Sequence, residues 1–245
     1  MKFTRSFLVG FAILLFGIGA GFISFVIFPI NKIFIKKNNY KMACCEVIQK
    51  TWKFITWFLE VTKIIKLEIE EKDNLTNISG KIIVASHRSL IDIVILISLI
   101  PKSICLAKKE LMKNFLFRNI LETLYITNDV DLDEFKETTV KALNDGYNVI
   151  IFPTGKRNKQ NEDLRIHKGP ALISIISGVS IIPISINCSS DFLQLNQPIL
   201  DAGNKTITYR IKLMPEIIPT DLQKENMSEI SLRNRISRKI KESIS

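Results

Sequence analysis

The sequence is poor in the residues from which common metal and nucleophile sites are built. Its 245 residues include only two histidines, four cysteines and ten glycines. No two cysteines are spaced as C-x-x-C and no histidine stands at metal-ligand spacing from a cysteine, so we predict no metal site and reduced thiols. The G-x-S-x-G nucleophile turn, the Gly-rich dinucleotide fingerprint and the P-loop are also absent from the sequence, which argues against three large enzyme classes.

Acidic side chains are outnumbered by basic ones. The chain has 34 Lys and Arg against 24 Asp and Glu, a formal charge of +10. This balance suits anionic partners such as nucleic acid, anionic lipids, phosphorylated substrates or acidic carrier proteins. Aromatic residues do not alternate with the basic ones as a nucleic-acid platform requires, so we expect no nucleic-acid partner.

The longest uncharged stretch lies near the N-terminus, over residues 7–28. Roughly 20 apolar residues are enough to cross a bilayer as a helix. A cleaved signal peptide is the alternative, but its apolar region is shorter, about 7–15 residues, and ends in a small-x-small site. The run here ends in Phe-Pro-Ile-Asn-Lys. Basic residues flank it on both sides: Lys2, Arg5, Lys32, Lys36 and Lys37.

We therefore predict an uncleaved membrane anchor helix over residues 1–38. More lysines follow the run than precede it, so the rest of the chain is expected on the cytoplasmic side of the cytoplasmic membrane. A helix lying within one leaflet fits the same pattern. Residues 39–63 form the next predicted helix, which is either amphipathic and interfacial, with Trp52 and Trp57 at the membrane surface, or simply packed on the domain.

Residues 64–245 alternate strand-like and helix-like stretches. This alternation predicts an α/β domain with a mixed, largely parallel sheet flanked by helices. We expect a basic helical tail over the last 25 residues. Four further expectations are a loop over 72–80, helices over 110–121 and 131–144, and an edge or antiparallel strand over 206–214.

Two segments that follow predicted strands contain unusual residues. The first is Ser86-His87-Arg88-Ser89-Leu90-Ile91-Asp92. An imidazole accepts a proton from an alcohol near neutral pH, and a carboxylate on its other ring nitrogen fixes the tautomer, so His87 and Asp92 are candidate catalytic residues. Alternatively, Ser89 and Asp92 form an S-x-x-D capping box, in which Asp92 serves only backbone donors.

The second segment is Phe152-Pro153-Thr154-Gly155-Lys156-Arg157. A buried strand ends there, Gly155 permits a tight turn, and two cations follow, which together suit a phosphate. Lys168 adds charge shortly afterwards, before a predicted helix N-terminus that favours anions. A solvated basic loop without a ligand is the alternative.

Four segments in order resemble the glycerolipid acyltransferase family typified by 1-acyl-glycerol-3-phosphate O-acyltransferase. They are ASHRSLID, AKKELMKNFLF, VIIFPTGKR and HKGPALISIISGVSIIPISI, within residues 80–190. The stretches SLIDIVILISLIP and ITND resemble the branch found with bacterial aryl-polyene pathways. The resemblance implies that His87 is the general base, that Asp92 is its partner, and that Gly155 and Arg157 belong to the acceptor-binding loop.

Two departures from the family pattern concern the acceptor. The family usually reads Phe-Pro-Glu-Gly-Thr-Arg, whereas this chain has Thr154 and Lys156 at the third and fifth positions. The family's Phe-Ile-Asp-Arg-like segment is replaced by Tyr-Ile-Thr-Asn at 125–128, without an Arg. We count Thr154, Lys156 and Lys168 among the expected substrate-binding residues.

The resemblance implies direct acyl transfer without a metal or cofactor. The donor is expected to be acyl-CoA or an acyl carrier protein, and the acceptor a hydroxyl of a lysophospholipid or other membrane lipid. Backbone amides would stabilise the oxyanion. Two alternatives are a catalytically inactive lipid-binding relative and a membrane-tethered nucleic-acid binder.

Overall fold

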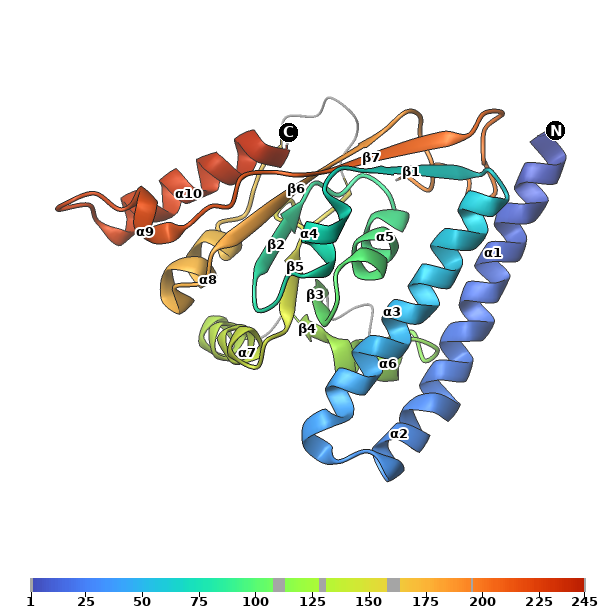
Figure 1. Ribbon diagram of the computed structural model, residues 1–245, viewed down its shortest axis with the longest axis horizontal. Helices are drawn as coiled ribbons and strands as arrows, with labels where there is room; N and C mark the ends of the chain where they lie inside the picture. Colours follow the sequence, from blue (N-terminus) through green and yellow to red (C-terminus); the bar gives the residue numbers. More distant parts are fainter. Residues whose placement is uncertain (1, 108–112, 128–130, 158–163, 195, 245) are drawn as a thin grey trace.

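The computed structural model describes residues 2–107, 113–127, 131–157, 164–194 and 196–244 (Figure 1). A seven-stranded sheet lies at its centre, in the order β1-β7-β6-β2-β5-β3-β4. Strands β6 and β7 pair antiparallel, and the other neighbours pair parallel. The strands are β1 (Ile65–Ile69), β2 (Ile82–Ala85), β3 (Ser103–Ala107), β4 (Tyr125–Thr127), β5 (Asn148–Ile151), β6 (Ile181–Cys188) and β7 (Ile207–Leu213).

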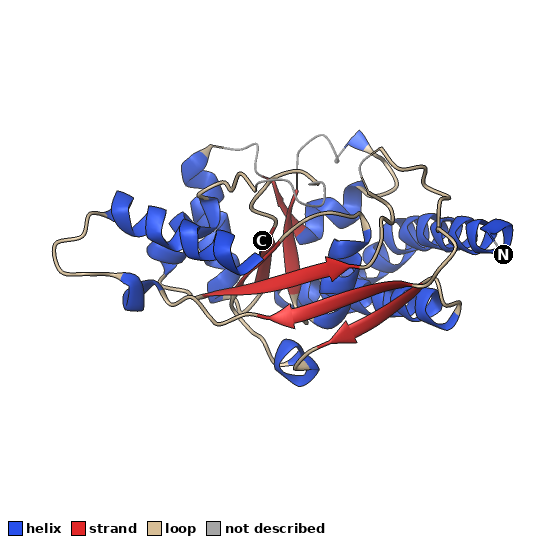
Figure 2. Ribbon diagram, turned by 90° about the horizontal axis from the view of Figure 1, so that it is seen from above, coloured by secondary structure: helices blue, strands red, loops and turns tan. Residues whose placement is uncertain are grey.

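Helices cover both faces of the sheet, so the predicted fold class is confirmed (Figures 1 and 2). Helix α3 packs against α5, and α8 and α10 pack against each other and against the central strands. Strands β2 and β5 are buried along their whole length, as expected for central parallel strands. The helices are α1 (Lys2–Phe22), the π-helical η1 (Ile23–Ile27), α2 (Phe28–Phe34), α3 (Lys37–Val61), α4 (Lys72–Thr76), α5 (Ile91–Leu99), α6 (Arg118–Leu124), α7 (Leu132–Asn144), α8 (Gly169–Ser177), α9 (Pro219–Leu222) and α10 (Glu229–Ile244).

Local signals in the sequence set several of these boundaries. The Asp131 side chain accepts a hydrogen bond from the Asp133 amide and caps α7, the helix predicted over 131–144. Helix α8 ends at Gly178, whose φ of 69° lies in the left-handed region that glycine adopts readily. The tail helix α10 buries an apolar stripe of Leu232, Ile236, Ile240 and Ile244.

Two local expectations were wrong. Residues 72–76 form the short helix α4 within the predicted loop. The helix predicted over 110–121 begins only at Arg118, since residues 113–117 form turns and residues 108–112 lie outside the described ranges. The strand predicted over 206–214 as edge or antiparallel is β7, which is antiparallel to β6 and lies inside the sheet because β1 pairs on its other side. The edge position is decided by long-range pairing, which local alternation does not encode.

The N-terminal helices form an antiparallel pair beside the domain (Figure 1). Residues 3–34 form one helix long and apolar enough to cross a membrane, by length and composition alone. It is attached at its start, where the Arg5 guanidinium donates to the carbonyls of Lys63, Ile64, Ala202 and Lys205. Further along it, Asn119 Nδ2 donates to the Ser24 carbonyl at 2.9 Å.

Helix α3 is packed on the protein along one face, and its interfacial role stays a prediction. Trp52 is buried and stacks on Phe16 with ring centroids 4.7 Å apart, so it belongs to the helix–helix interface. Trp57 and Phe54 on the opposite face are exposed. One face of α3 is therefore packed on the protein, while the other remains available to a membrane.

Candidate active site

The two unusual segments meet at one edge of the sheet. Strands β2 and β5 are parallel neighbours, with Val84 opposite Ile151. Carboxyl ends of parallel strands lie at the same edge, so the residues after Ala85 and those after Ile151 are brought together. The His87 imidazole stacks on the Phe152 ring, with centroids 4.2 Å apart and an interplanar angle of 24°. Phe152 thereby fixes the plane of the histidine ring.

His87 and Asp92 are in direct contact. The distance from His87 Nδ1 to Asp92 Oδ2 is 3.1 Å, and the exposed fractions of the two side chains are 19% and 1%. A carboxylate facing Nδ1 favours a proton on that nitrogen, which leaves Nε2 as the acceptor. The arrangement therefore has a buried carboxylate, an oriented imidazole, and a ring nitrogen directed away from the carboxylate.

Asp92 also accepts hydrogen bonds from the backbone. The amides of Arg88 and Ser89 each donate to Asp92 Oδ2 at 2.7 Å. The capping alternative had Asp92 serving backbone donors only, whereas the structure shows one oxygen that meets both amides and the histidine. The Ser89 hydroxyl donates to the Phe192 carbonyl instead. The same bonds that begin α5 therefore hold the carboxylate against His87.

The Phe-Pro-Thr-Gly-Lys-Arg loop forms the tight turn that the sequence predicted. Gly155 has φ +65°, and a β-carbon there would lie 3.3 Å from His167 Nε2. Thr154 is buried, and its hydroxyl donates to the Lys156 carbonyl at 2.9 Å, closing the turn. Thr154 thus stabilises the loop from the protein interior, whereas Gly155 and Lys156 are exposed on the protein surface.

The two cations expected to flank this loop lie in different places. Arg157 Nη1 donates to the Leu193 carbonyl at 3.1 Å, and the Leu90 amide donates to the same oxygen at 3.2 Å. Arg157 therefore lies beside the His87 turn. Lys168 Nζ instead donates to Asn234 Oδ1 of α10 at 2.6 Å. This contact joins two helices, so the structure does not place the Lys168 ammonium in the His87 site.

Three contributors to the site were not anticipated from the sequence. Phe152 was seen only as the end of a strand. The loop after β6 was not singled out, although the carbonyls of Phe192 and Leu193 accept bonds from both predicted segments. His167, which precedes Lys168, was not among the predicted site residues, yet it lies over Gly155. Every residue has a backbone carbonyl, so the sequence could not reveal which carbonyls contribute to the site. A histidine close in sequence to a cationic loop could have been recognised.

Comparison with known proteins supports the same assignment. The sequence model of the family described as Acyltransferase matches residues 66–187, which include both predicted segments. The chain belongs to the glycerolipid acyltransferase family. The prediction that it is an O-acyltransferase is confirmed at this level. The aryl-polyene branch stays a prediction, and residue 128 of the altered segment lies outside the described ranges.

Three relatives illustrate the likeness. The chain is 23% identical over 182 residues to the 1-acyl-sn-glycerol-3-phosphate acyltransferase of Borreliella burgdorferi, covering 72% of each chain. It is 24% identical to the human 1-acyl-sn-glycerol-3-phosphate acyltransferase beta, over 68% of this chain and 62% of that one. The crystal structure of the 1-acyl-sn-glycerophosphate acyltransferase PlsC from Thermotoga maritima superposes with a TM-score of 0.76 over 99% of this chain and 95% of that one, at 19% identity. That likeness shows a shared fold.

Proposed function

We propose that this acyltransferase moves a fatty acyl group from a thioester to a hydroxyl of a lysophospholipid-like acceptor in phospholipid biosynthesis. One observation supports this most directly: His87 Nδ1 faces the buried Asp92 carboxylate at 3.1 Å, at the edge of the sheet where a cationic loop also begins. The relatives' names point to 1-acylglycerol-3-phosphate as the acceptor class. The net positive charge of the chain favours binding of the acceptor's phosphate group and of an anionic donor, which is acyl-CoA or acyl carrier protein.

The chemistry follows from the orientation of His87. Nε2 takes the proton of the acceptor hydroxyl while that oxygen attacks the thioester carbonyl. The carbon–sulfur bond then breaks, and the thiolate takes the proton from the imidazolium, so the histidine is restored. Asp92 stabilises the transient imidazolium through Nδ1. We propose that the transfer needs neither a covalent acyl-enzyme nor a cofactor.

The test is the turnover of purified full-length protein in mixed vesicles, with oleoyl-CoA as donor. Lysophosphatidic acid and monoacylglycerol serve as two acceptors. We expect His87→Ala to lower turnover by about 10²–10⁴-fold, the usual contribution of a general base. Thr139→Ala is the control, because this buried residue lies in α7 and its hydroxyl donates to the Phe135 carbonyl of the same helix at 2.7 Å. Wild-type turnover in His87→Ala would contradict the mechanism, and no transfer by the wild-type protein to either lipid would contradict the function.

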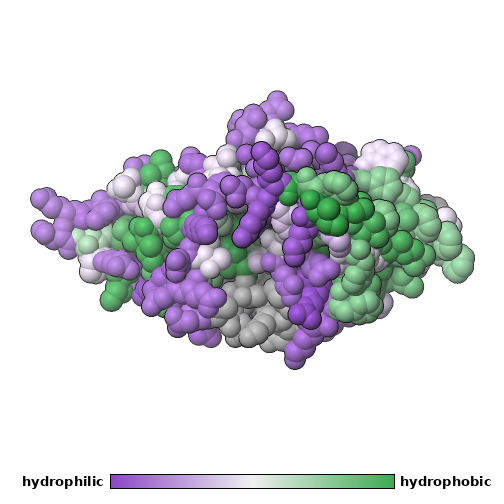
Figure 3. Space-filling model, turned by 90° about the horizontal axis from the view of Figure 1, so that it is seen from below, coloured by the Kyte–Doolittle hydropathy of each residue, from purple (hydrophilic) through white to green (hydrophobic). Residues whose placement is uncertain are grey.

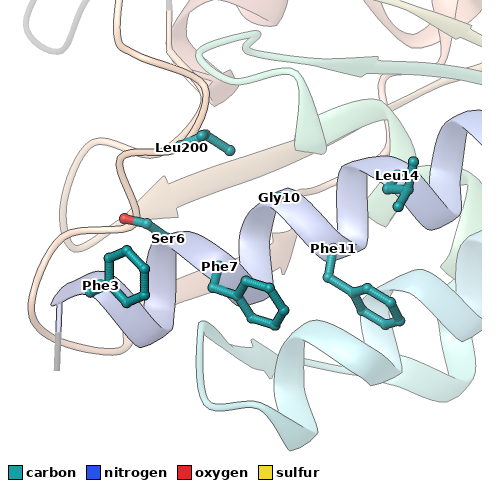
Figure 4. A pocket seen from close by; sticks show the side chains of 7 residues that line it. All are labelled: Phe3, Ser6, Phe7, Gly10, Phe11, Leu14 and Leu200. Carbon is teal, nitrogen blue, oxygen red and sulfur yellow. The ribbon is translucent and has the colours of Figure 1, made fainter.

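We further propose that α1 lies along the membrane surface rather than across the bilayer. The start of α1 is held on the domain by Arg5, and η1, which follows α1 directly, is held by Asn119, so both ends of α1 lie against the domain. Its outward face is apolar, because Phe3, Phe7 and Leu14 are exposed, and Figure 4 shows Phe7 projecting from the helix. Apolar side chains also gather over this end of the molecule in Figure 3. A one-sided apolar face is typical of a helix immersed in one leaflet.

Thiol labelling from one side of the membrane tests this placement. A cysteine at exposed Thr4 reports the start of α1, and one at exposed Lys239 reports the domain. In sealed inverted vesicles, an impermeant maleimide should label both Thr4→Cys and Lys239→Cys, in a background with Cys188→Ser. Labelling of position 239 alone would mean that α1 crosses the bilayer.

A further inference from the structure

Asp92 and Tyr209 each contain a buried polar atom without a hydrogen-bond partner in the described part of the chain. Asp92 Oδ1 and the Tyr209 hydroxyl are both buried, and neither has a hydrogen-bond partner among the residues that the structure describes. Leaving such atoms unpaired costs about 1–3 kcal/mol each, so buried acceptors and donors are normally satisfied. A carboxylate oxygen only accepts and a phenol donates, so these two atoms are chemically complementary.

Tyr209 reaches this place because of how β7 is paired. β7 is antiparallel to β6, so its first residues lie at the carboxyl end of β6, on the same edge of the sheet as His87. Tyr209 stands opposite Cys188 in that pairing. It points inward with Ile207, whereas the next residue, Arg210, is exposed. Only 1% of Tyr209 is exposed.

The electrostatics agree with this placement. Burial raises the pKa of the Tyr209 hydroxyl, and the Asp92 charge raises it further, so the phenol stays protonated and able to donate. A side-chain contact with Ser89, whose hydroxyl donates to the Phe192 carbonyl, lowers that pKa by a smaller amount, so Tyr209 lies beside the turn that holds Asp92. Burial and Asp92 likewise raise the pKa of the Cys188 thiol, so it stays neutral.

We propose that Tyr209 is a positioning residue for the acyl transfer: its hydroxyl donates to one enclosed water, which in turn donates to Asp92 Oδ1. The two backbone amides hold Oδ2, and Tyr209 holds the other oxygen, so the carboxylate cannot rotate away from His87 Nδ1. A donor on Oδ1 also withdraws part of the negative charge that stabilises the imidazolium. This inference rests on the proposed general-base function of His87.

The test uses Tyr209→Phe, which removes one oxygen and keeps the ring. We expect kcat to fall about three- to thirtyfold while the KM values for oleoyl-CoA and for the accepted lysolipid stay nearly unchanged, since the lost contact supports the base alone. The acidic limb of the pH profile of kcat/KM should move upward by about half a unit, because the imidazolium gains charge stabilisation. The other charged or titratable groups around this site are Arg88, Asp191 and Cys188, and all stay in place.

Tyr147→Phe is the matched control. Tyr147 is also buried, at 6% exposed, but it lies near Lys41 on another part of the domain. It should leave the pH profile unchanged even if it lowers the melting temperature. A second measurement introduces Tyr209→Phe into the Asp92→Asn variant. The fall in kcat caused by Tyr209→Phe should be smaller there than in the wild-type background, because the carboxylate that Tyr209 supports has already been replaced.

Three outcomes would overturn the inference. One is a Tyr209→Phe enzyme with wild-type kcat and pH profile. Another is a fall in kcat without a shift of the acidic limb, which would show a purely structural role. The third is full additivity with Asp92→Asn. If His87→Ala instead kept wild-type turnover, the proposed function would fail first, which distinguishes the two failures.

Discussion

Asp92 has two roles in the structure, and two substitutions separate them. Its Oδ2 accepts from two backbone amides at 2.7 Å and faces His87 Nδ1 at 3.1 Å. Asp92→Asn keeps a carbonyl oxygen for the amides but removes the charge. Asp92→Ala removes both. The first change should therefore affect catalysis alone, whereas the second should affect catalysis and folding.

The magnitudes follow from these contacts. A buried donor left without its acceptor costs about 1–3 kcal/mol, so two amides make Asp92→Ala less stable by about 2–6 kcal/mol. Asp92→Asn keeps both bonds without the charge assistance and should cost about 1 kcal/mol. Both variants lose the stabilisation of the imidazolium, so kcat should fall by about a hundredfold or more in each.

Denaturant unfolding in detergent gives the stability, and acyl transfer from oleoyl-CoA gives kcat. Ser98→Ala is a suitable control in the same helix, because its buried hydroxyl bonds only the Ile95 carbonyl at 2.7 Å and should not alter turnover. Wild-type turnover in Asp92→Asn would show that the carboxylate is a helix cap and nothing more. Equal instability of the Asn and Ala variants would show that the two amides do not depend on the side-chain oxygen.

Three further predictions concern the neighbouring loop. Arg157→Ala should raise the acceptor KM about ten- to a hundredfold and leave the donor KM unchanged, and an equal rise in both would contradict a role in acceptor binding. Thr154→Glu with Lys156→Thr should shift preference towards lysophosphatidic acid over monoacylglycerol, and unchanged preference would mean that these positions do not set specificity. Phe152→Leu should lower kcat about threefold or more by freeing the ring of His87, and an unaltered kcat would show that the stacking is incidental.

Much of the fold could be read from local pattern. The apolar N-terminal helix, the helix over 131–144 and the basic helical tail each reflect short-range chemistry, and they lie where the pattern predicted. The division into an anchor over 1–38, an interfacial helix over 39–63 and a domain over 64–245 stays a prediction, since it depends on a membrane. The loop predicted from residue 72 and the helix predicted from residue 110 were wrong, because tertiary packing overrides weak local propensity in both segments.

The candidate site likewise combines features that the sequence predicts with features that only the tertiary structure determines. The sequence by itself determined which residue types are available: one histidine and one carboxylate five positions apart, and a Gly-Lys-Arg turn after a buried strand. Only the tertiary structure decided that β2 and β5 are neighbours, that the Leu193 carbonyl joins Arg157 to the His87 turn, and that Lys168 contacts α10 instead. It also decided that Tyr209, 117 positions after Asp92 in the sequence, is buried at the same edge of the sheet. The physical reason is that strand order and loop contacts arise from burying the whole apolar core at once, which local spacing does not encode.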